Sequence, residues 1–250
     1  YEQNEEVTRL LSINCNARII WGGDETVNSV RQLPIPPRSV EVVFSDRYSF
    51  CVVDAISVNS LEESDLNRLV EGFYNDTYLM DQNACSSPHL LVWLGKESST
   101  AKDRFWKALS KIIIEKKYRM THAGAADKYV QLCNDAIKLD NLDAVKAYGS
   151  NLYCITIKEL PSNIDKYRGS CGYFYEYTTE DLRGLSHIVN NSFQTLTYFG
   201  ADREYLLDFV LDNGLSGIDR IVPVGQALDI GVIWDGYDIV KSLSRIVDLQ

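Results

Sequence analysis

Apolar and polar residues follow two rhythms along this chain, one of helical spacing and one of short continuous apolar runs. Near the start, the spacing of Val7, Leu10 and Leu11 predicts a short amphipathic helix, and the apolar run at 17–21 predicts a strand. Further strands are predicted over residues 40–44, 49–53, 90–94, 153–157, 173–177 and 194–199. Further helices are predicted over residues 24–32, 60–80, 100–117, 124–138, 142–148, 179–189, 204–211 and 237–247.

The clearest of these helices is the one predicted to begin at Ser60. Ser60 and Glu63 have the spacing of a capping box, in which each side chain accepts from the backbone N–H of the other residue. The apolar residues that follow keep helical spacing up to Met80. A polar loop, 81–89, then leads into the next apolar strand.

Strands and helices alternate from one end of the chain to the other, without an internal repeat or a low-complexity linker. Such alternation favours mostly parallel strand pairing, because a parallel neighbour needs a crossover that a helix supplies. The pattern therefore predicts the α/β class with a mostly parallel sheet.

Composition excludes several classes of protein. The 250 residues are 45% hydrophobic and 24% charged, which is typical of a globular chain with a sizeable core. A net charge of −10 argues against a duplex-binding surface, which needs clustered Lys and Arg. No apolar run approaches the ~18 residues of a membrane-spanning helix. We therefore expect neither nucleic acid nor a membrane span among the partners.

The six cysteines lie far apart and form no CxxC or Cys/His ligand pair, so no metal site is predicted. Cys51, Cys133 and Cys154 fall inside apolar patterns, which is typical of buried reduced thiols. The first residues show no signal peptide. These features predict a reducing, cytoplasmic location.

Cys85 differs from the other cysteines because it lies in the polar loop, close to Asn83 and His89. A reactive thiol needs partial exposure and nearby donors that favour the thiolate, and such a loop offers both. From these residues alone, an inert thiol in an ordinary loop is the favoured interpretation. His89 could act as a base, although its place at the start of a strand favours a ring that points away.

Two short turns contain residues that suit a ligand or a cap. Residues 21–24, Trp-Gly-Gly-Asp, end a strand and open a helix, and the glycines Gly22 and Gly23 would allow a close approach of a ligand. Asp24 would repel a phosphate, so a plain tight turn is the favoured interpretation from the residues alone. Near the end, 234–237 resembles a helix entry with Asp235 as its cap.

Taken together, four strings resemble one family. They are Ile-Trp-Gly-Gly-Asp at 20–24, Phe-Ser-Asp-Arg-Tyr-Ser at 44–49, Asp-Gln-Asn-Ala-Cys-Ser-Ser-Pro at 81–88, and the segment 220–229 followed by Trp-Asp-Gly-Tyr at 234–237. In this order they resemble the LuxC-type fatty-acyl-CoA reductases, the reductase component of the luminous-bacterial fatty-acid reductase complex. This family lies within the aldehyde dehydrogenase superfamily.

The resemblance implies a fold and a reaction. It implies an aldehyde-dehydrogenase-like catalytic domain with a partial nucleotide-binding domain, and it places Cys85 at the nucleophile position. The family reduces an acyl thioester to an aldehyde with NADPH, through an acyl-enzyme on that cysteine. Gly22 and Gly23 would face the nicotinamide, and Asn83 with nearby backbone amides would stabilise the oxyanion.

Departures from the wider superfamily refine these expectations. No glutamate matches the Glu-Leu-Gly-Gly-Lys string of oxidising members near residues 44–48, which fits a reductase, since an activated water would hydrolyse the acyl-enzyme. The nearest counterpart of the superfamily's Glu-x-Phe-Gly-Pro string is 169–172. Two alternatives stay open: an oxidising CoA-acylating aldehyde dehydrogenase, and a non-redox module for acyl transfer or partner docking.

The resemblance also predicts the organisation of the chain. We expect 1–52 to be the end of the cofactor-binding domain, 53–230 the catalytic domain and 231–250 a helical return segment. The start without Met and the incomplete nucleotide-binding unit predict the C-terminal part of a longer reductase. At full length we expect an oligomer, with acyl-protein synthetase and acyltransferase subunits as partners.

Overall fold

The computed structural model describes residues 4–96 and 98–250, which form two compact units. The small unit comprises the described residues up to Arg47 together with Ile230–Gln250, and the large unit is Tyr48–Asp229. The helices are α1 Glu5–Ile13, α2 Asp24–Arg31, α3 Ala55–Ser60, α4 Glu63–Thr77, α5 Ser98–Glu115, α6 His122–Lys138, α7 Arg203–Asp212 and α8 Ile239–Leu243, with 3₁₀ turns η1 Tyr78–Met80, η2 Ile164–Lys166 and η3 Leu182–Ile188. The strands are β1 Ala17–Trp21, β2 Val40–Phe44, β3 Tyr48–Asp54, β4 Pro88–Leu94, β5 Leu142–Ala147, β6 Tyr153–Ile157, β7 Tyr173–Thr179, β8 Phe193–Phe199, β9 Arg220–Pro223, β10 Ile233–Trp234 and β11 Tyr237–Asp238.

The large unit is built on one seven-stranded sheet with the order β5-β6-β7-β4-β3-β8-β9. Every neighbouring pair is parallel except β5 and β6, which are antiparallel. This confirms the predicted α/β class with a mostly parallel sheet. The central strands β3 and β4 lie between parallel neighbours on both sides, as their near-continuous apolar sequences indicate.

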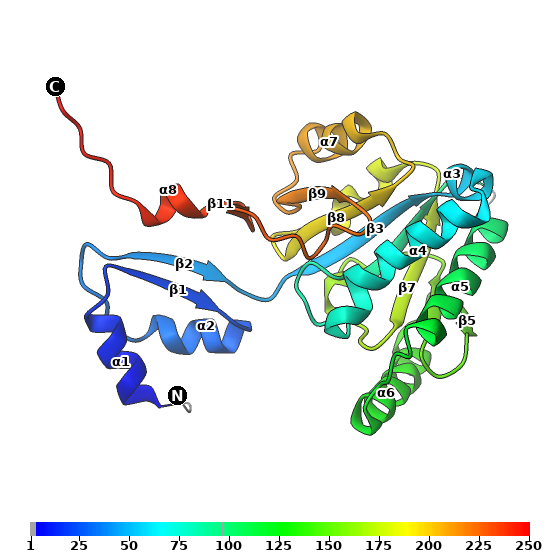
Figure 1. Ribbon diagram of the computed structural model, residues 1–250, viewed down its shortest axis with the longest axis horizontal. Coiled ribbons are helices and arrows are strands. Elements are labelled where there is room, and N and C mark those ends of the chain that lie inside the picture. Colours follow the sequence, from blue (N-terminus) through cyan, green and yellow to red (C-terminus); the bar gives the residue numbers. More distant parts are fainter. Residues whose placement is uncertain (1–3, 97) are drawn as a thin grey trace. The chain divides into compact units, whose positions relative to one another are not determined.

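Two apolar cores cover the two faces of this sheet. On β3, Cys51 and Val53 point into a core with α3, α4 and α5, whereas Phe50 and Val52 point into the opposite core. That second core includes buried residues of η3 and α7. Figure 1 shows α4 and α5 along one side of the sheet and α7 on the other. The large unit is therefore a three-layer sandwich in which β4 is the middle strand of the sheet and β3 lies next to it.

The small unit contains two short sheets and three helices. β1 and β2 pair in parallel with α2 as their crossover, and β10 and β11 form an antiparallel hairpin. The side chains of Ile19 and Trp21 on β1 are exposed. Asn4 caps α1 by accepting from the Val7 backbone N–H. None of the described helices in either unit is long and apolar enough to cross a membrane.

Three predicted elements differ from the structure. Ser60 does not cap the long helix, because residues 55–60 form the separate helix α3, and α4 begins after Glu62. The segment predicted as a helix at 142–148 is instead β5, because its backbone pairs with the edge of β6. The segment 179–189 contains a 3₁₀ helix that Asp181 caps, rather than an α-helix capped by Thr179.

The C-terminal segment also differs from its prediction. Residues 234–237 do not begin a helix, because Asp235 and Gly236 have φ angles of 51° and 77° and form the tight turn of the β10–β11 hairpin. The helix that follows is short, and its cap is Asp238, which accepts from the Lys241 N–H. Asp235 instead forms an ion pair with Arg47 at 2.7 Å.

The two units divide the chain after Arg47 and after Asp229, and the predicted functional division into 1–52, 53–230 and 231–250 stays a prediction. β3 pairs with β4 and β8 from its first residues onward, so Tyr48 already belongs to the large unit. At the other end, the segment from Ile230 groups with the N-terminal residues in the small unit.

Candidate functional site

The Cys85 loop lies where an α-helix turns back into the central sheet. After η1, Asp81 and Gln82 both take left-handed conformations, with φ angles of 51° and 60°, which reverses the chain. The loop then continues to β4, which begins at Pro88. Cys85 is partly exposed and Asn83 is exposed, so both predicted site residues can meet a substrate.

Gln82 holds this loop in place with its buried amide. Its Oε1 accepts from the backbone N–H groups of Gly172 at 2.7 Å and Tyr173 at 2.9 Å. Its Nε2 donates to the carbonyl of Tyr173 at 3.1 Å, and the side chain is 1% exposed. A buried amide with three such partners fixes a backbone that would otherwise be strained. The segment 169–172, the nearest counterpart of the superfamily's Glu-x-Phe-Gly-Pro string, is therefore joined to the Cys85 loop through Gly172.

Ser49 connects Cys85 to the sheet. Its hydroxyl donates to the Cys85 carbonyl at 2.7 Å and accepts from the Thr195 N–H at 3.1 Å. Ser49 is fully buried at the amino end of β3. Because the hydroxyl bonds to a loop on one side and to β8 on the other, it joins three segments at one atom.

The two strands that flank β3, which are β8 and β4, each have an extra residue beside Ser49. Between Tyr48 and Phe50, β3 has one residue, whereas β8 has two, Gln194 and Thr195. On the other side, His89 is the extra residue of β4. A bulge of this kind re-aims side chains and is frequent beside functional sites.

The bulge in β8 brings Gln194 to the nucleophile. The Gln194 Nε2 lies 3.5 Å from the Cys85 Sγ, in the geometry of an N–H donating to sulfur. The Gln194 side chain is 2% exposed, and its Oε1 accepts from the Thr195 hydroxyl at 3.3 Å. The arrangement therefore presents an amide donor to the candidate nucleophile.

Asp76 ties the same region to the loop after β9. Its buried carboxylate accepts from the N–H groups of Gly225 at 2.6 Å and Ala227 at 2.9 Å, and its carbonyl accepts from the Ser87 hydroxyl. Burial raises the pKa of Asp76 to about 6, although the two N–H donors act in the opposite direction. One residue of α4 thus anchors both the end of the Cys85 loop and the 225–227 turn.

His89 is held in the interior of the sheet. Its Nδ1 lies 3.0 Å from the Gly169 carbonyl, and its ring stacks on Tyr48 with centroids 5.5 Å apart. Burial, and then the positive charge of Arg168, lower the pKa of His89 to about 4. The ring is therefore neutral at physiological pH and donates to the Gly169 carbonyl, in keeping with the expectation that it points away.

The other thiols differ from Cys85 in their surroundings. None of the six cysteines forms a disulfide. Burial raises the pKa of Cys51 to about 12 and that of Cys154 well above its usual range, so both are inert. The prediction of a buried Cys133 is wrong, because this residue lies on an exposed face of α6.

Gly22 and Gly23 lie in the small unit, between β1 and α2. The Gly22 N–H donates to the Phe44 carbonyl at 3.1 Å, and Gly23 is the N-cap residue of α2. The Asp46 carboxylate accepts from the Asp24 N–H at 3.1 Å, so the first turn of α2 already has an anionic partner. The structure thus places the two predicted site groups, around Cys85 and around Gly22, in different units.

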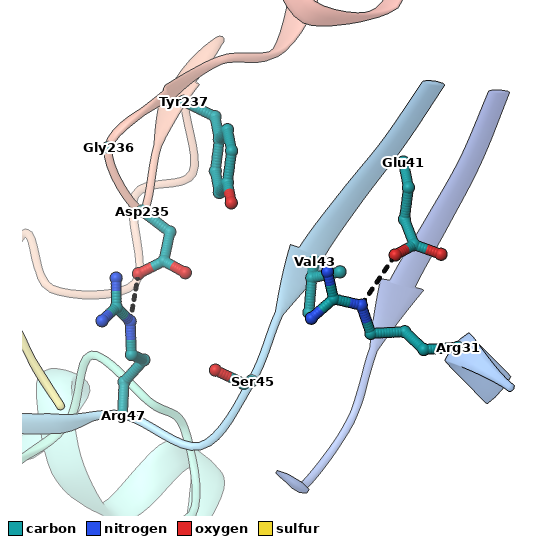
Figure 2. A pocket seen from close by; sticks show the side chains of 8 residues that line it. All are labelled: Arg31, Glu41, Val43, Ser45, Arg47, Asp235, Gly236 and Tyr237. Carbon is teal, nitrogen blue, oxygen red and sulfur yellow. Dashed lines mark hydrogen bonds and ion pairs between the residues drawn. The ribbon is translucent and has the colours of Figure 1, made fainter. Parts of the chain in front are cut away.

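A pocket of about 370 Å³ in the small unit lies between β2 and the β10–β11 hairpin (Figure 2). Two ion pairs line it, Arg31 with Glu41 at 2.9 Å and Arg47 with Asp235 at 2.7 Å. Each guanidinium faces a carboxylate, so the charges of these two pairs balance. Neither Cys85 nor Gly22 lines this pocket.

Sequence reasoning did not find Ser49, Gln82, Asp76 or Gln194. A signal was present, since Ser49 and Gln194 are polar residues at the starts of otherwise apolar strands. Such residues are buried only when they have partners. The β3–β8 pairing that joins Ser49 to Thr195 and Gln194 to Cys85 connects residues 146 and 109 positions apart, and no local pattern indicates it.

The fold is that of the aldehyde dehydrogenase superfamily. Similar solved structures include 1-pyrroline-5-carboxylate dehydrogenase from Thermus thermophilus (TM-score 0.58, 13% identity, covering 92% of this chain and 47% of that one). Others are aldehyde dehydrogenase 21 from Physcomitrella patens (0.57, 12%, 90% and 48%) and an NAD-dependent aldehyde dehydrogenase from Sinorhizobium meliloti (0.59, 10%, 88% and 45%). The chain thus spans about half the length of these structures.

The sequence comparison gives the family. The family description "Acyl-CoA reductase (LuxC)" matches residues 1–125, half of the chain, including the Gly22 turn and the Cys85 loop. The chain belongs to the LuxC acyl-CoA reductase family, as the four strings predicted. No curated protein sequence matches the chain.

Proposed function

We propose that the protein reduces a fatty-acyl thioester, acyl-CoA or acyl-protein, to an aldehyde through an acyl-enzyme on Cys85. The observation that carries this proposal is the Cys85 thiol itself. It is partly exposed in a loop that buried hydrogen bonds hold, and the Gln194 amide lies 3.5 Å from its sulfur. A positioned and accessible thiol with a nearby donor is what nucleophilic attack on a thioester requires.

In the first step, the Cys85 thiolate attacks the thioester carbonyl. A new C–S bond forms, and the substrate's C–S bond breaks to release its thiol, which takes up the proton that Cys85 has lost. Bond energies nearly balance because one thioester replaces another, so the protein's task is mainly to position the acyl group. A nicotinamide cofactor, when bound, supplies the hydride that completes the reduction, and cleavage of the Cys85 C–S bond then releases the aldehyde.

Stabilisation of the oxyanion falls to groups beside Cys85. The backbone N–H groups of Asn83 and Ser87 already donate within the loop, to Met80 at 2.8 Å and to Ala84 at 2.9 Å. These two amides are therefore not the donors. The exposed side chain of Asn83 keeps its proposed role, since it can turn toward an acyl group on the sulfur.

The surroundings of Phe44 support reduction over oxidation. Phe44 occupies the region that matches the superfamily's glutamate base, and it is 3% exposed. Its ring packs on Trp21 at 5.0 Å and on Tyr237 at 5.9 Å. No glutamate stands in this string, and its one carboxylate, Asp46, accepts from the Asp24 N–H, so the acyl-enzyme would persist until it is reduced.

The residues at the Gly22 turn fit one end of a dinucleotide. A backbone without side chains allows a flat ring to approach closely, which suits the nicotinamide. The carboxylates of Asp24, Glu25 and Asp46 surround the start of α2 and do not suit a diphosphate. We therefore assign Gly22 and Gly23 to the nicotinamide end only, with NADPH as the proposed cofactor.

The proposal includes a setting for the enzyme. The thiol chemistry of Cys85 requires a reducing compartment such as the cytoplasm. The proposed partners are acyl-protein synthetase and acyltransferase subunits, in an oligomer of the full-length protein.

The test is mass spectrometry with peptide mapping after incubation with a labelled fatty acyl-CoA. We expect one adduct, on Cys85, which Cys85→Ser abolishes and Cys133→Ser leaves unchanged. Cys133 is a matched control because it is an exposed thiol of the same unit. Equal labelling of several cysteines, or an adduct that persists in Cys85→Ser, would overturn the proposal.

The fate of the adduct distinguishes the alternatives. Release of the label as aldehyde on addition of NADPH is the expected result. Release as a free acid would instead favour a hydrolytic enzyme, whereas an adduct that only returns to CoA, in an enzyme that forms acyl-CoA from added aldehyde and NADP⁺, would favour the oxidising CoA-acylating dehydrogenase. An adduct that passes to an acceptor thiol and never responds to a nicotinamide cofactor would favour the acyl-transfer module.

A further inference from the structure

The amino edge of the large sheet contains a donor whose position depends on an irregularity in the fold. Strands β3, β4 and β8 all begin at this edge, at Tyr48, Pro88 and Phe193. In regular pairing, a single residue of β8 would lie opposite Ser49. Instead, β8 has an extra residue opposite Ser49, and Gln194 lies within this bulge.

The bulge is stabilised by specific partners. The Thr195 N–H, which the irregular pairing leaves without a strand partner at this level, donates to the Ser49 hydroxyl at 3.1 Å. The same hydroxyl donates to the Cys85 carbonyl at 2.7 Å. One hydroxyl therefore sets the position of the nucleophile's backbone and of the bulge relative to one another.

The orientation of the Gln194 amide follows from its neighbours. Its Oε1 accepts from the Thr195 hydroxyl at 3.3 Å, which turns the Nε2 toward the Cys85 Sγ at 3.5 Å. The side chain is nearly fully buried, so water competes little for its donor. Two ionisable groups of the same edge are engaged elsewhere: Asp76 by Gly225 and Ala227, and His89 by Gly169.

We propose that Gln194 is a catalytic residue that stabilises the Cys85 thiolate by donating its amide N–H to the sulfur, and that Ser49 is the positioning residue that holds the pair in register. This inference rests on the proposed role of Cys85 as the nucleophile. A hydrogen bond to the charged form favours that form, so the donor raises the fraction of thiolate at neutral pH. Unlike a base, an amide supplies this stabilisation without taking up a proton and without activating water.

The experiment measures the rate at which iodoacetamide alkylates Cys85 between pH 6 and 10, followed by peptide mass mapping of the whole chain. In Gln194→Leu, the loss of one hydrogen bond to the thiolate should raise the pH midpoint by about half to one unit and slow alkylation at pH 7.5 roughly threefold to tenfold. Gln194→Glu should shift the midpoint further upward, because it places a carboxylate beside the sulfur.

Two controls separate this role from a structural one. Cys51 is buried in the same sheet and should stay unreactive in every variant, whereas a loosened fold would expose it. Gln131→Leu removes another amide of the large unit, one that donates to Asp135 and Tyr175. It should leave the pH profile of Cys85 unchanged.

The outcomes decide both proposals separately. A Gln194→Leu profile that equals the wild-type profile, with Cys51 still protected, would overturn the role of Gln194. A shifted profile in a protein whose Cys85 takes no label from acyl-CoA would support the donor and overturn the proposed function. A fall in reactivity without any shift of the midpoint would overturn the thiolate role, since it would indicate only a change in access.

Discussion

β3 crosses two regions of the large unit that are built in different ways. From Phe50 to Val53, its residues pair in unbroken register with β4 and β8, and its side chains alternate between two apolar cores. At Ser49, both neighbours have an extra residue, and the bonds run through side chains instead of the strand ladder. The regular region stabilises the fold, whereas the irregular edge positions the side chains around Cys85.

This difference explains where the nucleophile lies. In open α/β sheets, ligands commonly bind at the carboxyl ends of the strands. Cys85 instead precedes β4, at the amino ends of β3, β4 and β8. Buried hydrogen bonds of Gln82, Ser49 and Asp76 hold the loop that contains Cys85 in place at this edge.

The largest expected effect concerns the regular region. Phe73 on α4 is fully buried and packs against Phe105 and Phe174, each with ring centroids 5.2 Å away. Phe73→Ala should lower the free energy of unfolding by about 3–5 kcal/mol, because the cavity cannot refill. Urea denaturation measures it, with the exposed Ile114→Ala as a control that should change stability by less than about 0.5 kcal/mol. Equal losses in the two variants would contradict the packing described here.

A buried carboxylate inside the regular region gives the next largest effect. Glu176 accepts from the indole N–H groups of Trp93 at 3.1 Å and Trp106 at 2.9 Å, and from the Thr156 hydroxyl. Glu176→Leu should cost about 2–4 kcal/mol of unfolding free energy, since it leaves these buried donors without an acceptor. Glu176→Gln keeps one acceptor oxygen and should lose less. A Leu variant as stable as the wild type would show that the donors find other partners.

The edge should respond in the opposite way, with a small loss of stability and a large change of reactivity. Ser49→Ala removes one donor and one acceptor and should cost about 1–2 kcal/mol in urea denaturation. The exposed Ser64→Ala is the matched control, and it should change neither stability nor the alkylation of Cys85. If Ser49→Ala reacts at the wild-type rate, the edge does not hold Cys85 in the way described here.

The difference between the regular region and the irregular edge also explains which features the sequence could predict. Periodicity and apolar runs predicted β1, β2, β4, β6, β7 and β8 closely, because a buried strand must be apolar. They failed at β5, where the residues are mostly exposed and only pairing with β6 defines the strand. They also failed at Asp235, where two left-handed residues make a hairpin turn in place of a helix start.

At the site, the sequence predicted the position of Cys85 but not its partners. Its polar loop and the family strings are local features. Gln194 lies 109 positions away, and it reaches the sulfur only because β8 bulges beside β3. A one-residue irregularity in the pairing of distant strands leaves no periodic signal in a single sequence.

The smallest expected effect is a pH dependence of stability in which the contributions of two groups at the edge, Asp76 and His89, nearly cancel. The pKa of Asp76, about 6, lies above the 3.8 of an ordinary carboxyl, so the folded state binds more protons and stability falls as the pH rises from about 4 to 6. The pKa of His89, about 4, lies below the ordinary 6.5, so the folded state binds fewer protons and stability rises over nearly the same window.

Each group alone should change the free energy of unfolding by about 3 kcal/mol across this window, at about 1.4 kcal/mol per pKa unit, in opposite directions. Relative to a double variant, Asp76→Asn with His89→Gln, the wild type should therefore change by less than about 1 kcal/mol between pH 4 and 6.5. With His89→Gln alone, stability relative to the double variant should fall with rising pH, because only the raised pKa of Asp76 then contributes. With Asp76→Asn alone, it should rise. Urea denaturation at several pH values measures the free energy of unfolding of the wild type, the two single variants and the double variant. If stability changed with pH in the same direction in both single variants, the pKa values of Asp76 and His89 would not be shifted in opposite directions.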